Sequence, residues 1–242
     1  MRICVAQTAS LKGRLKENIE NHLLIINRAS EFNSDLIIFP ELSITNYETA
    51  LAQKLATNIN DKLFDPFRKL ADQKNIAIGI GMPTTSPDGI RISMLLFQPQ
   101  RKSFVYSKQI LDPDEIPHFT AGFDQIILSI KGKKVAFGIC YEALQAEHFL
   151  KAFKSGFDIY IASVAMTQSG IDRGSVHFPQ MAKEYGAPIL MSNCIGLYDN
   201  IITVGQTAVW NKKGDIVEKL GEKNQGFIVY DSQSGAAEIG RI

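Results

Sequence analysis

The apolar run Leu36-Ile37-Ile38-Phe39 constrains the fold of this 242-residue chain more than any other segment. A run without alternating polar side chains is typical of a strand that is buried on both faces. The segment before it predicts an amphipathic helix, because apolar residues recur there at helical spacing: Leu15, Ile19, Leu23 and Ile26. A strand buried on both faces needs covering layers. We therefore expect an α/β fold, with a mixed sheet or a pair of sheets covered by helices.

Strand-like and helix-like segments alternate along the rest of the chain. Helices are predicted from Thr49 to Asp72, interrupted near Pro66, from Ala143 to Lys154, and near Pro179 to Tyr185 with the proline in the first turn. Strands are predicted at Ile3 to Gln7, Ile76 to Gly81, Ile90 to Phe97, Ser103 to Tyr106, Ile126 to Ile130, Val135 to Ile139, Ile159 to Ala162, Pro188 to Ser192, Thr203 to Trp210, Ile216 to Leu220 and Phe227 to Tyr230. No linker or repeat divides the chain, so we expect one domain over residues 1–242. We expect residues 232–242 to be disordered or held by another subunit.

Composition and charge exclude several classes of partner. The formal net charge of +1 gives no electrostatic reason to expect nucleic acid or an anionic membrane. No apolar run reaches the ~18 residues that span a bilayer, and the N-terminus turns polar at Gln7, so we expect a cytoplasmic protein. Cys4, Cys140 and Cys194 are too scattered for a disulfide framework or a metal-binding pair. Each should be a free thiol, and no metal site is expected.

Three chemically capable residues each come directly after a buried apolar strand. Glu41 follows the run ending at Phe39-Pro40, Lys108 follows a strand ending at Ser107, and Cys140 follows a strand ending at Ile139. Ligands in α/β folds bind beyond the carboxyl ends of strands. These three side chains, although distant in sequence, are therefore expected to meet in one crevice.

The three residue types form a coherent set for nucleophilic catalysis. A thiol attacks as thiolate, so Cys140 needs a base or a positive neighbour, and a helix starting after it would favour the anion. Glu41 in an apolar setting would have a raised pKa and serve as general base and then acid. Lys108 would stabilise an oxyanion. Taken singly, each has a structural alternative: a buried hydrophobic thiol, a helix-capping carboxylate and a solvated lysine.

Each of the three residues lies in a longer segment: Phe39-Pro40-Glu41-Leu42-Ser43-Ile44-Thr45-Asn46-Tyr47, Tyr106-Ser107-Lys108-Gln109-Ile110-Leu111 and Gly138-Ile139-Cys140-Tyr141-Glu142. Together these segments resemble the nitrilase, or carbon–nitrogen hydrolase, superfamily. They look like the family's Glu, Lys and Cys motifs, in the family's order. The resemblance implies a four-layer αββα sandwich, often paired into a homodimer or higher homo-oligomer, and catalysis without metal or organic cofactor. Glu41 would be the base, Cys140 the nucleophile that forms a thioester, and Lys108 with the Tyr141 backbone N–H the oxyanion site.

The resemblance also implies a second acidic residue after the lysine. Glu115 matches it best, although Asp114 is adjacent and stays an alternative. Further expectations concern substrate binding. Tyr47 and Phe119 are expected to line the pocket. Ser163 and Asn193 lie at strand ends that the fold would bring near Cys140. Glu142 is expected either to bind a substrate amine or to anchor the turn after the nucleophile. The histidines His118, His148 and His177 are expected to be structural.

The expected reaction is hydrolysis of an amide bond in a small molecule, with release of ammonia or an amine. Hydrolysis of an N-carbamoyl amide is the alternative, because no residue selects one acyl group over another. ATP-driven synthesis is not expected, since no phosphate-cradling glycine loop is present. Two other classes stay open: a catalytically silent, metabolite-binding relative, and a redox-sensing thiol protein in which Cys194 approaches Cys140 in space.

Overall fold

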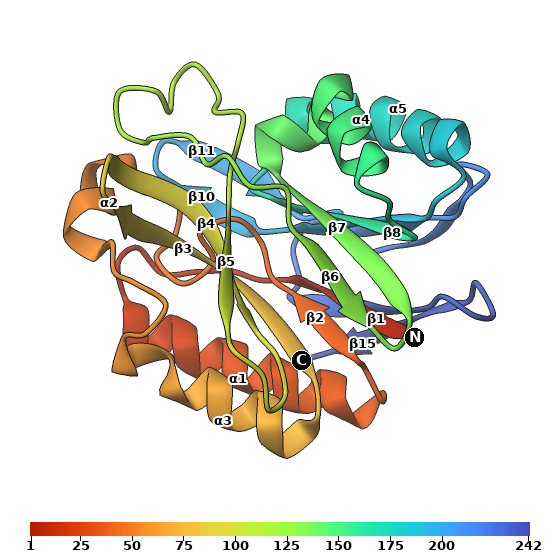
Figure 1. The fold of residues 1–242 in the computed structure, drawn as a ribbon, viewed down its shortest axis with the longest axis horizontal. Helices are drawn as coiled ribbons and strands as arrows, with labels where there is room; N and C mark the ends of the chain where they lie inside the picture. Colours follow the sequence, from red (N-terminus) through yellow and green to blue (C-terminus); the bar gives the residue numbers. More distant parts are fainter.

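Two β-sheets lie face to face at the centre of the molecule, and a pair of helices covers the outer face of each (Figure 1). The computed structural model describes all residues, 1–242. The layers follow the order helices, sheet, sheet, helices, which is the expected αββα sandwich. The seven-stranded sheet has the order β15-β14-β1-β2-β3-β4-β5, with bounds β1 (Arg2–Gln7), β2 (Leu36–Ile38), β3 (Ala77–Ser86), β4 (Gly89–Phe97), β5 (Phe104–Ser107), β14 (Gly226–Asp231) and β15 (Ala237–Arg241).

The second sheet has six strands in the order β13-β12-β9-β8-β7-β6. Its members are β6 (Ile127–Ile130), β7 (Lys133–Ile139), β8 (Ile159–Val164), β9 (Ile189–Asn193), β12 (Ala208–Trp210) and β13 (Ile216–Lys219). A separate hairpin is formed by β10 (Ile195–Tyr198) and β11 (Ile201–Val204). The helices are α1 (Leu15–Glu31), α2 (Thr49–Leu55), α3 (Asp65–Lys74), α4 (Ala146–Lys154) and α5 (Gln168–Tyr185), with 3-10 turns η1 (Lys62–Phe64) and η2 (Cys140–Leu144).

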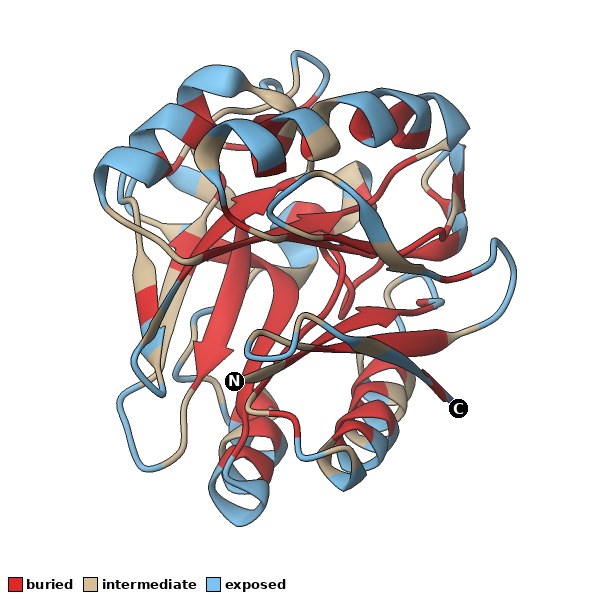
Figure 2. Ribbon diagram, turned by 90° about the vertical axis from the view of Figure 1, so that its right-hand side faces the viewer, coloured by how far each residue is buried: buried red, intermediate tan, exposed pale blue.

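Alternation of side chains along each strand produces three apolar layers. In β1, Ile3 and Val5 point between the two sheets, whereas Cys4 and Ala6 point toward the helices on the outer face. One cluster lies between the sheets, a second under α1 and α3, and a third under α4 and α5. Figure 2 shows the result: the central strands of both sheets are buried, the edge strands are partly exposed, and the helices are buried only on their inner sides. This explains the unbroken apolar runs in the sequence.

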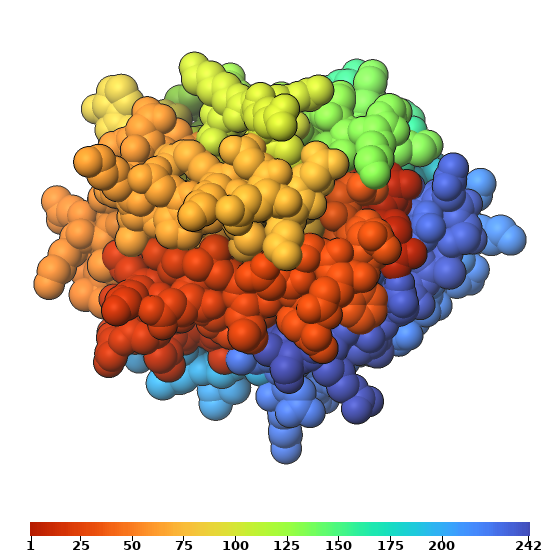
Figure 3. Space-filling view, turned by 90° about the horizontal axis from the view of Figure 1, so that it is seen from below, coloured from red at the N-terminus to blue at the C-terminus, as the bar shows by residue number.

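The helices α1 and α3 form the outer layer of the seven-stranded sheet, and Figure 3 views this layer from below. Residues of α1 (red to orange) and α3 (orange to yellow) cover most of that face, with C-terminal residues (blue) beside them. None of the helices in the molecule is long and apolar enough to cross a bilayer.

The carboxyl ends of the central parallel strands bring the two sheets' loops together. Strands β1, β2 and β3 run parallel in one sheet, and β7, β8 and β9 run parallel in the other. The Ser163 hydroxyl on β8 donates to the Phe39 carbonyl just after β2, at 2.8 Å, and so links the sheets at this end. The loops that carry Glu41 and Cys140 start from these ends.

Several sequence predictions need correction. Helix α5 spans Gln168–Tyr185 with Pro179 in its interior, so the predicted start near Pro179 is wrong. Loss of one backbone hydrogen bond at a proline costs about 3 kcal/mol. The helix continues because Ile171, Phe178 and Met181 pack beneath it. The predicted strand Thr203 to Trp210 is split into β11 and β12, and β10 was not predicted.

The C-terminal segment is also different from expectation. Residues Ala237–Arg241 form β15, which pairs antiparallel with β14 at the edge of the seven-stranded sheet. Residues 237–241 are therefore ordered by pairing within the chain's own sheet, whereas a contact of this edge with a second subunit stays a prediction. The apolar pattern of the segment is weak because β15 is an edge strand, of which only Gly240 is buried. An edge strand without an alternating apolar pattern gives no strand signal in the sequence.

Candidate active site

A cavity of about 340 Å³ opens where the loops from the two sheets converge. It lies between the long loop from β5 to β6, the turn after β7, the start of α5 and the β10–β11 turn. Its lining residues are Glu41, Tyr47, Thr49, Lys108, Asp112, Asp114, Glu115, His118, Cys140, Tyr141, Leu144, Ala165, Met166, Thr167, Gly170, Arg173, Asp199, Asn200 and Ile201. Glu41, Lys108 and Cys140, predicted to converge from separate strands, all line this one cavity.

Glu41 is held rigidly in the loop after β2. Leu42 has a φ of 49°, in the left-handed region, and this turns the chain sharply after Glu41. Gly81 of β3 lies against the turn so closely that a Cβ there would come 2.3 Å from the Leu42 nitrogen. The Glu41 side chain is buried, and its Oε2 has no hydrogen-bond partner in the protein. One carboxylate oxygen is thus free to accept a proton inside the cavity.

Lys108 bridges two carboxylates. Its Nζ donates to Glu41 Oε1 at 2.9 Å and to Glu115 Oε1 at 2.7 Å, and all three side chains are buried. The Tyr47 hydroxyl donates to the same Glu115 oxygen at 2.9 Å. The Asp112 backbone N–H donates to Glu115 Oε2 at 2.8 Å. Glu115 is therefore the acidic residue in contact with the lysine, whereas Asp114 is exposed at the rim of the cavity.

Cys140 occupies a strained turn. Its φ is 49°, a left-handed conformation that is uncommon for a residue with a side chain. The chain passes there from β7 into η2, and the half-buried thiol lines the cavity. Strain at such a position is typical of a nucleophile that projects from a strand-to-helix turn. Cys4 and Cys194 are fully buried and line no part of this cavity.

The electrostatics of the site favour a neutral thiol beside a poised base. Burial raises the pKa of Glu41 to about 7, with the nearby Lys108 opposing the shift. Burial, followed by the charge of Glu41, also raises the pKa of Cys140, and Lys108 offsets only part of this. Burial opposes the charge of Lys108, but Glu41 and Glu115 outweigh it and its pKa is raised. The helix expected directly after Cys140 is instead a five-residue 3-10 turn, η2, and burial is the largest influence on the pKa of the thiol.

The residues expected to bind substrate divide into two groups. Tyr47 and Tyr141 line the cavity. Phe119 does not, because it packs in the core between the sheets. Ser163 is buried in its bond to Phe39, and Asn193 is buried behind the cavity, where its Oδ1 accepts from the Met166 N–H at 2.8 Å. Asn193 therefore holds the lining residue Met166 from behind, whereas Ser163 links the two sheets and does not line the cavity.

Glu142 is buried and points away from the cavity. Its carboxylate accepts hydrogen bonds from backbone N–H groups, so it anchors the turn and is not placed to bind a substrate amine. His148 contacts it in the same buried network. His118, expected to be structural, instead lines the cavity.

The sequence reasoning missed one wall of the cavity, formed by the first turns of α5. Gly170 and Arg173 line the cavity from this wall. The available signal was the helical spacing of Ile171, Phe178 and Met181, which spans the proline. Asp199, in the β10–β11 turn, was missed as well, because that hairpin was not predicted.

Comparisons with known proteins identify a family and a set of solved structures with the same fold. A model of the family described as "Carbon-nitrogen hydrolase" matches residues 2–240. Curated relatives are the glutamine-dependent NAD(+) synthetases of Acinetobacter baylyi, 24% identical over 89% of this chain and 41% of that protein, and of Aquifex aeolicus, 27% identical over 100% and 44%. The chain therefore spans less than half the length of these relatives.

Solved structures with the same fold include an amidase from Nesterenkonia sp. AN1. A mutant of that amidase, with acrylamide added to its active-site cysteine, matches with a TM-score of 0.87 at 22% identity, covering 96% of this chain and 92% of that one. Another mutant, in complex with butyramide, matches with a TM-score of 0.88 at 22% identity, covering 97% and 92%. At this identity the likeness establishes the fold.

Proposed function

Because the chain belongs to the carbon–nitrogen hydrolase family, we propose that it hydrolyses an amide bond of a small molecule through a thioester on Cys140. The observation that carries this proposal is the placement of a thiol, an unpartnered buried carboxylate oxygen and a buried ammonium in one cavity. These are the groups that acyl transfer needs: a nucleophile, a base and an oxyanion stabiliser.

In the first half of the reaction, Glu41 accepts the proton of the Cys140 thiol as the sulfur attacks the amide carbonyl carbon. A Glu41 pKa of about 7 suits a group that must take up and then release a proton near neutral pH. The negative charge that develops on the carbonyl oxygen is stabilised by Lys108 and by the Tyr141 backbone N–H. The carbon–nitrogen bond then breaks, Glu41 returns the proton to the leaving nitrogen, and the acyl group stays on sulfur.

In the second half, water replaces the amine. Glu41 is again a carboxylate and takes a proton from the attacking water, which adds to the thioester carbonyl. Collapse of this intermediate releases the carboxylic acid, and the proton returns to the Cys140 sulfur. Glu115 keeps Lys108 in place throughout, because it contacts Nζ at 2.7 Å and is itself held by Tyr47. No step uses a metal or an organic cofactor.

The cavity favours a small substrate that carries polar or charged groups. Its volume of about 340 Å³ lies at the small end of ligand sites. Beyond the buried charges of Glu41, Lys108 and Glu115, the cavity has further charged groups at its rim. These are the carboxylates of Asp112, Asp114 and Asp199 and the guanidinium of Arg173, none of which has an ion-pair partner. A substrate with a charged group at the end away from its amide would meet these side chains.

The test is ammonia release from a panel of short amides, ω-amides and N-carbamoyl amino acids. Glutamine and butyramide belong in the panel, because relatives are named as glutamine-dependent and as bound to butyramide. The matched control is Cys140→Ala, with its fold checked by circular dichroism. Release by the wild type and not by the variant supports the proposal. Preferential release from N-carbamoyl compounds would favour the alternative reaction, and silence of a folded wild type across the panel would contradict amide hydrolysis and favour a metabolite-binding role.

The homodimer and the cytoplasmic location rest on the family resemblance and on the three free thiols, and both belong to this proposal. Exposed apolar side chains on the outer helical layer, Leu150 and Phe153 of α4 and Val176 of α5, would be covered by a second copy. Light scattering at working concentration tests this, and a monomeric mass would contradict the dimer.

A further inference from the structure

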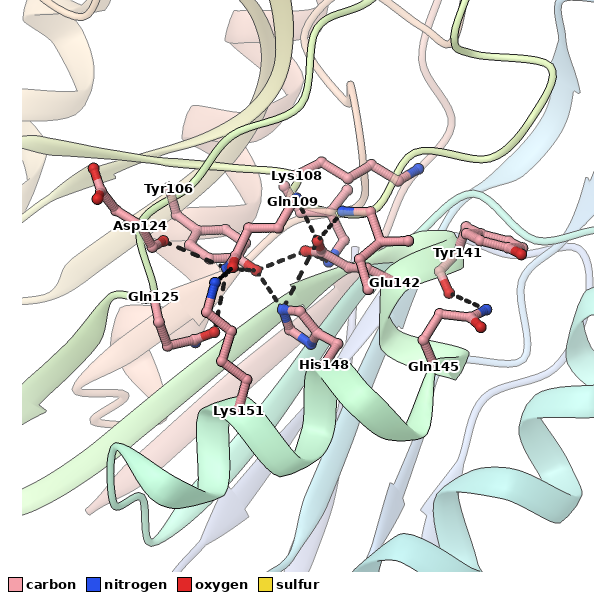
Figure 4. Close-up of polar contacts among 12 residues, drawn as sticks. Tyr106, Lys108, Gln109, Asp124, Gln125, Tyr141, Glu142, Gln145, His148 and Lys151 are labelled. Atoms are coloured by element: carbon pink, nitrogen blue, oxygen red, sulfur yellow. Dashed lines mark hydrogen bonds and ion pairs between the residues drawn. The ribbon is translucent and has the colours of Figure 1, made fainter.

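A single buried carboxylate lies behind the cavity and contacts both loops that carry the reacting groups. Glu142 is completely buried, and its two oxygens point in different directions (Figure 4). Oε1 accepts from the Ile139 backbone N–H at 2.7 Å and from the Tyr106 hydroxyl at 2.6 Å. Oε2 accepts from the backbone N–H groups of Gln109 at 2.6 Å and Ile110 at 3.2 Å.

These contacts connect the two sheets at positions adjacent to the site. Ile139 directly precedes Cys140 and ends β7 of the six-stranded sheet. Gln109 directly follows Lys108, after β5 of the seven-stranded sheet. One side chain therefore fixes the backbone one residue from the thiol and one residue from the ammonium. We propose that Glu142 is a positioning residue that sets the separation of Cys140 from Lys108.

The polar groups behind Glu142 fix its orientation. All its partners are donors, so the carboxylate acts only as an acceptor. Because the Tyr106 hydroxyl donates to Glu142, its oxygen accepts from His148 Nε2, at 2.8 Å. His148 Nδ1 then accepts from the Tyr160 hydroxyl, at 3.0 Å. Burial lowers the pKa of His148, in keeping with this neutral tautomer. The chain of donors runs in one direction, from Tyr160 to His148 to Tyr106 to Glu142.

The glycine at position 138 allows this series of hydrogen-bonded side chains to lie close to the nucleophile. A Cβ on Gly138 would come 1.9 Å from the Tyr160 hydroxyl oxygen. The tyrosine therefore packs directly against the end of strand β7, two residues before Cys140. The network is packed against the nucleophile's strand as well as bonded to it.

The kinetic consequence rests on the proposed amide hydrolysis. In Glu142→Gln the amide NH₂ must face backbone N–H donors on one side, so one of the two loops loses its anchor. A displacement of about 1 Å in an active site costs on the order of 100-fold in rate. We expect kcat of the folded variant to fall by about that factor with KM little changed, since no substrate contact is removed.

A second readout does not depend on finding the substrate. The rate of Cys140 alkylation by chloroacetamide is measured against pH, with modification of the Cys140 peptide followed by mass spectrometry. The ionisable groups facing the thiol are Glu41, Lys108, Glu115 and Tyr47, and Lys108 is the side chain that lowers the thiol's pKa. Moving Lys108 away in Glu142→Gln should shift the alkylation profile to higher pH. This arm decides the positioning role even if the wild type hydrolyses no amide.

Two variants complete the design. Tyr106→Phe keeps the carboxylate and removes one donor, so it should give a smaller loss of kcat, about tenfold or less, and it serves if Glu142→Gln does not fold. Asp61→Asn is the matched control, because Asp61 also accepts a backbone N–H (from Leu63, at 2.8 Å) but lies outside the cavity. It should leave kcat and the alkylation profile unchanged. Folded Glu142→Gln, or Tyr106→Phe in its place, with wild-type kcat and a wild-type alkylation profile would overturn the proposal and leave Glu142 a structural anchor only.

Discussion

The Lys108 ammonium lies 2.9 Å from the Glu41 carboxylate, and neither side chain has any exposed surface. Glu115 contacts the same ammonium, so two carboxylates share one cation. Burial, together with the charge of Glu115, raises the pKa of Glu41 above that of an ordinary carboxyl group, although Lys108 opposes the shift. Both the activity of the site and its dependence on pH should reflect this arrangement.

Replacing Glu41 with glutamine should abolish turnover without unfolding the protein. Glutamine has the same shape and still accepts a hydrogen bond from Lys108, but it cannot take the thiol proton. A general base contributes typically 10²–10⁴-fold, so kcat/KM should fall by about that range. Thermal unfolding by circular dichroism should stay close to the wild type. Turnover within a few-fold of the wild type would remove Glu41 from the role of base.

Activity should fall as the pH drops through the pKa of Glu41. The base must be ionised, and below about pH 7 the buried carboxyl is protonated. The acid limb of kcat/KM should therefore lie near pH 7, well above that of an exposed glutamate. Glu115 raises the Glu41 pKa through its charge, so in Glu115→Gln the limb should move to lower pH. An acid limb that stays in place in this variant would show that another group titrates.

Lys108→Met should destabilise the fold strongly at pH 8. It leaves two buried carboxylates without a counter-charge, and breaking a buried pair in this way costs about 3–5 kcal/mol. The folded-state pKa of Glu41, already raised by burial, rises further without the lysine, so the loss should be greatest above pH 7 and smaller at pH 5, where Glu41 takes up a proton. Urea denaturation at both pH values measures it. The double variant Lys108→Met/Glu115→Gln should recover part of the stability, and a deficit that is equal at both pH values would contradict the electrostatic cause.

Much of this site follows from the sequence because its parts sit at strand ends. Buried strands without polar residues are visible as short apolar runs, and a polar residue directly after one marks the edge of the sheet. This local signal makes Glu41, Lys108 and Cys140 candidates, and the three motif segments around them that resemble the carbon–nitrogen hydrolase family complete the prediction. The relation of Lys108 to Glu115 does not follow from the local signal, because it depends on how the loop from residue 108 to residue 126 folds back. The path of this loop is set by tertiary packing, and the loop sequence has no periodic pattern from which its path could be predicted.

Arg173 should affect selectivity more than chemistry. It lines the cavity from α5 without an ion-pair partner, so an anionic group on the substrate would be its partner. Arg173→Gln should raise KM for amides that carry a carboxylate by about tenfold, while a neutral amide of the same length keeps its KM. Steady-state kinetics on the matched pair of substrates measures the difference. Equal effects on both would mean that Arg173 is only a solvated rim residue.

The edge strand β15 should tolerate no side chain at Gly240. A Cβ there would come 2.0 Å from the Phe227 ring, which is buried against it. Overpacking of this kind typically costs about 1–3 kcal/mol, so Gly240→Ala should lower the free energy of unfolding by that amount. Gly221→Ala is the matched control, because a Cβ there meets nothing within 4 Å. Equal stability of the two variants in urea would mean that β15 moves aside freely.

The parts that sequence reasoning missed share a physical reason. Pro179 and two glycines, Gly170 and Gly174, interrupt the pattern of α5, yet its apolar side packs on the sheet and the helix persists. Strand β15 lies at an edge, where the polar and apolar faces differ little. In both cases tertiary contacts decide the structure against a weak local preference. The role of Glu142 depends on tertiary contacts as well. From sequence alone, a glutamate close to the nucleophile could bind a substrate amine or anchor the turn, and only its hydrogen-bond partners decide between these roles.

The left-handed backbone at Cys140 limits which amino acids could ever serve as the nucleophile in this turn. Among side chains that attack carbonyl groups, threonine is branched at Cβ and fits poorly at a φ of 49°, whereas serine is not branched and fits as well as cysteine. Serine would nevertheless present Glu41 with an alcohol far less acidic than a thiol, and a carboxylate with a pKa of about 7 is a weak base for it. The shape of the turn thus excludes threonine, and the weakness of the base excludes serine. Cysteine fits the turn and has a proton that Glu41 can accept.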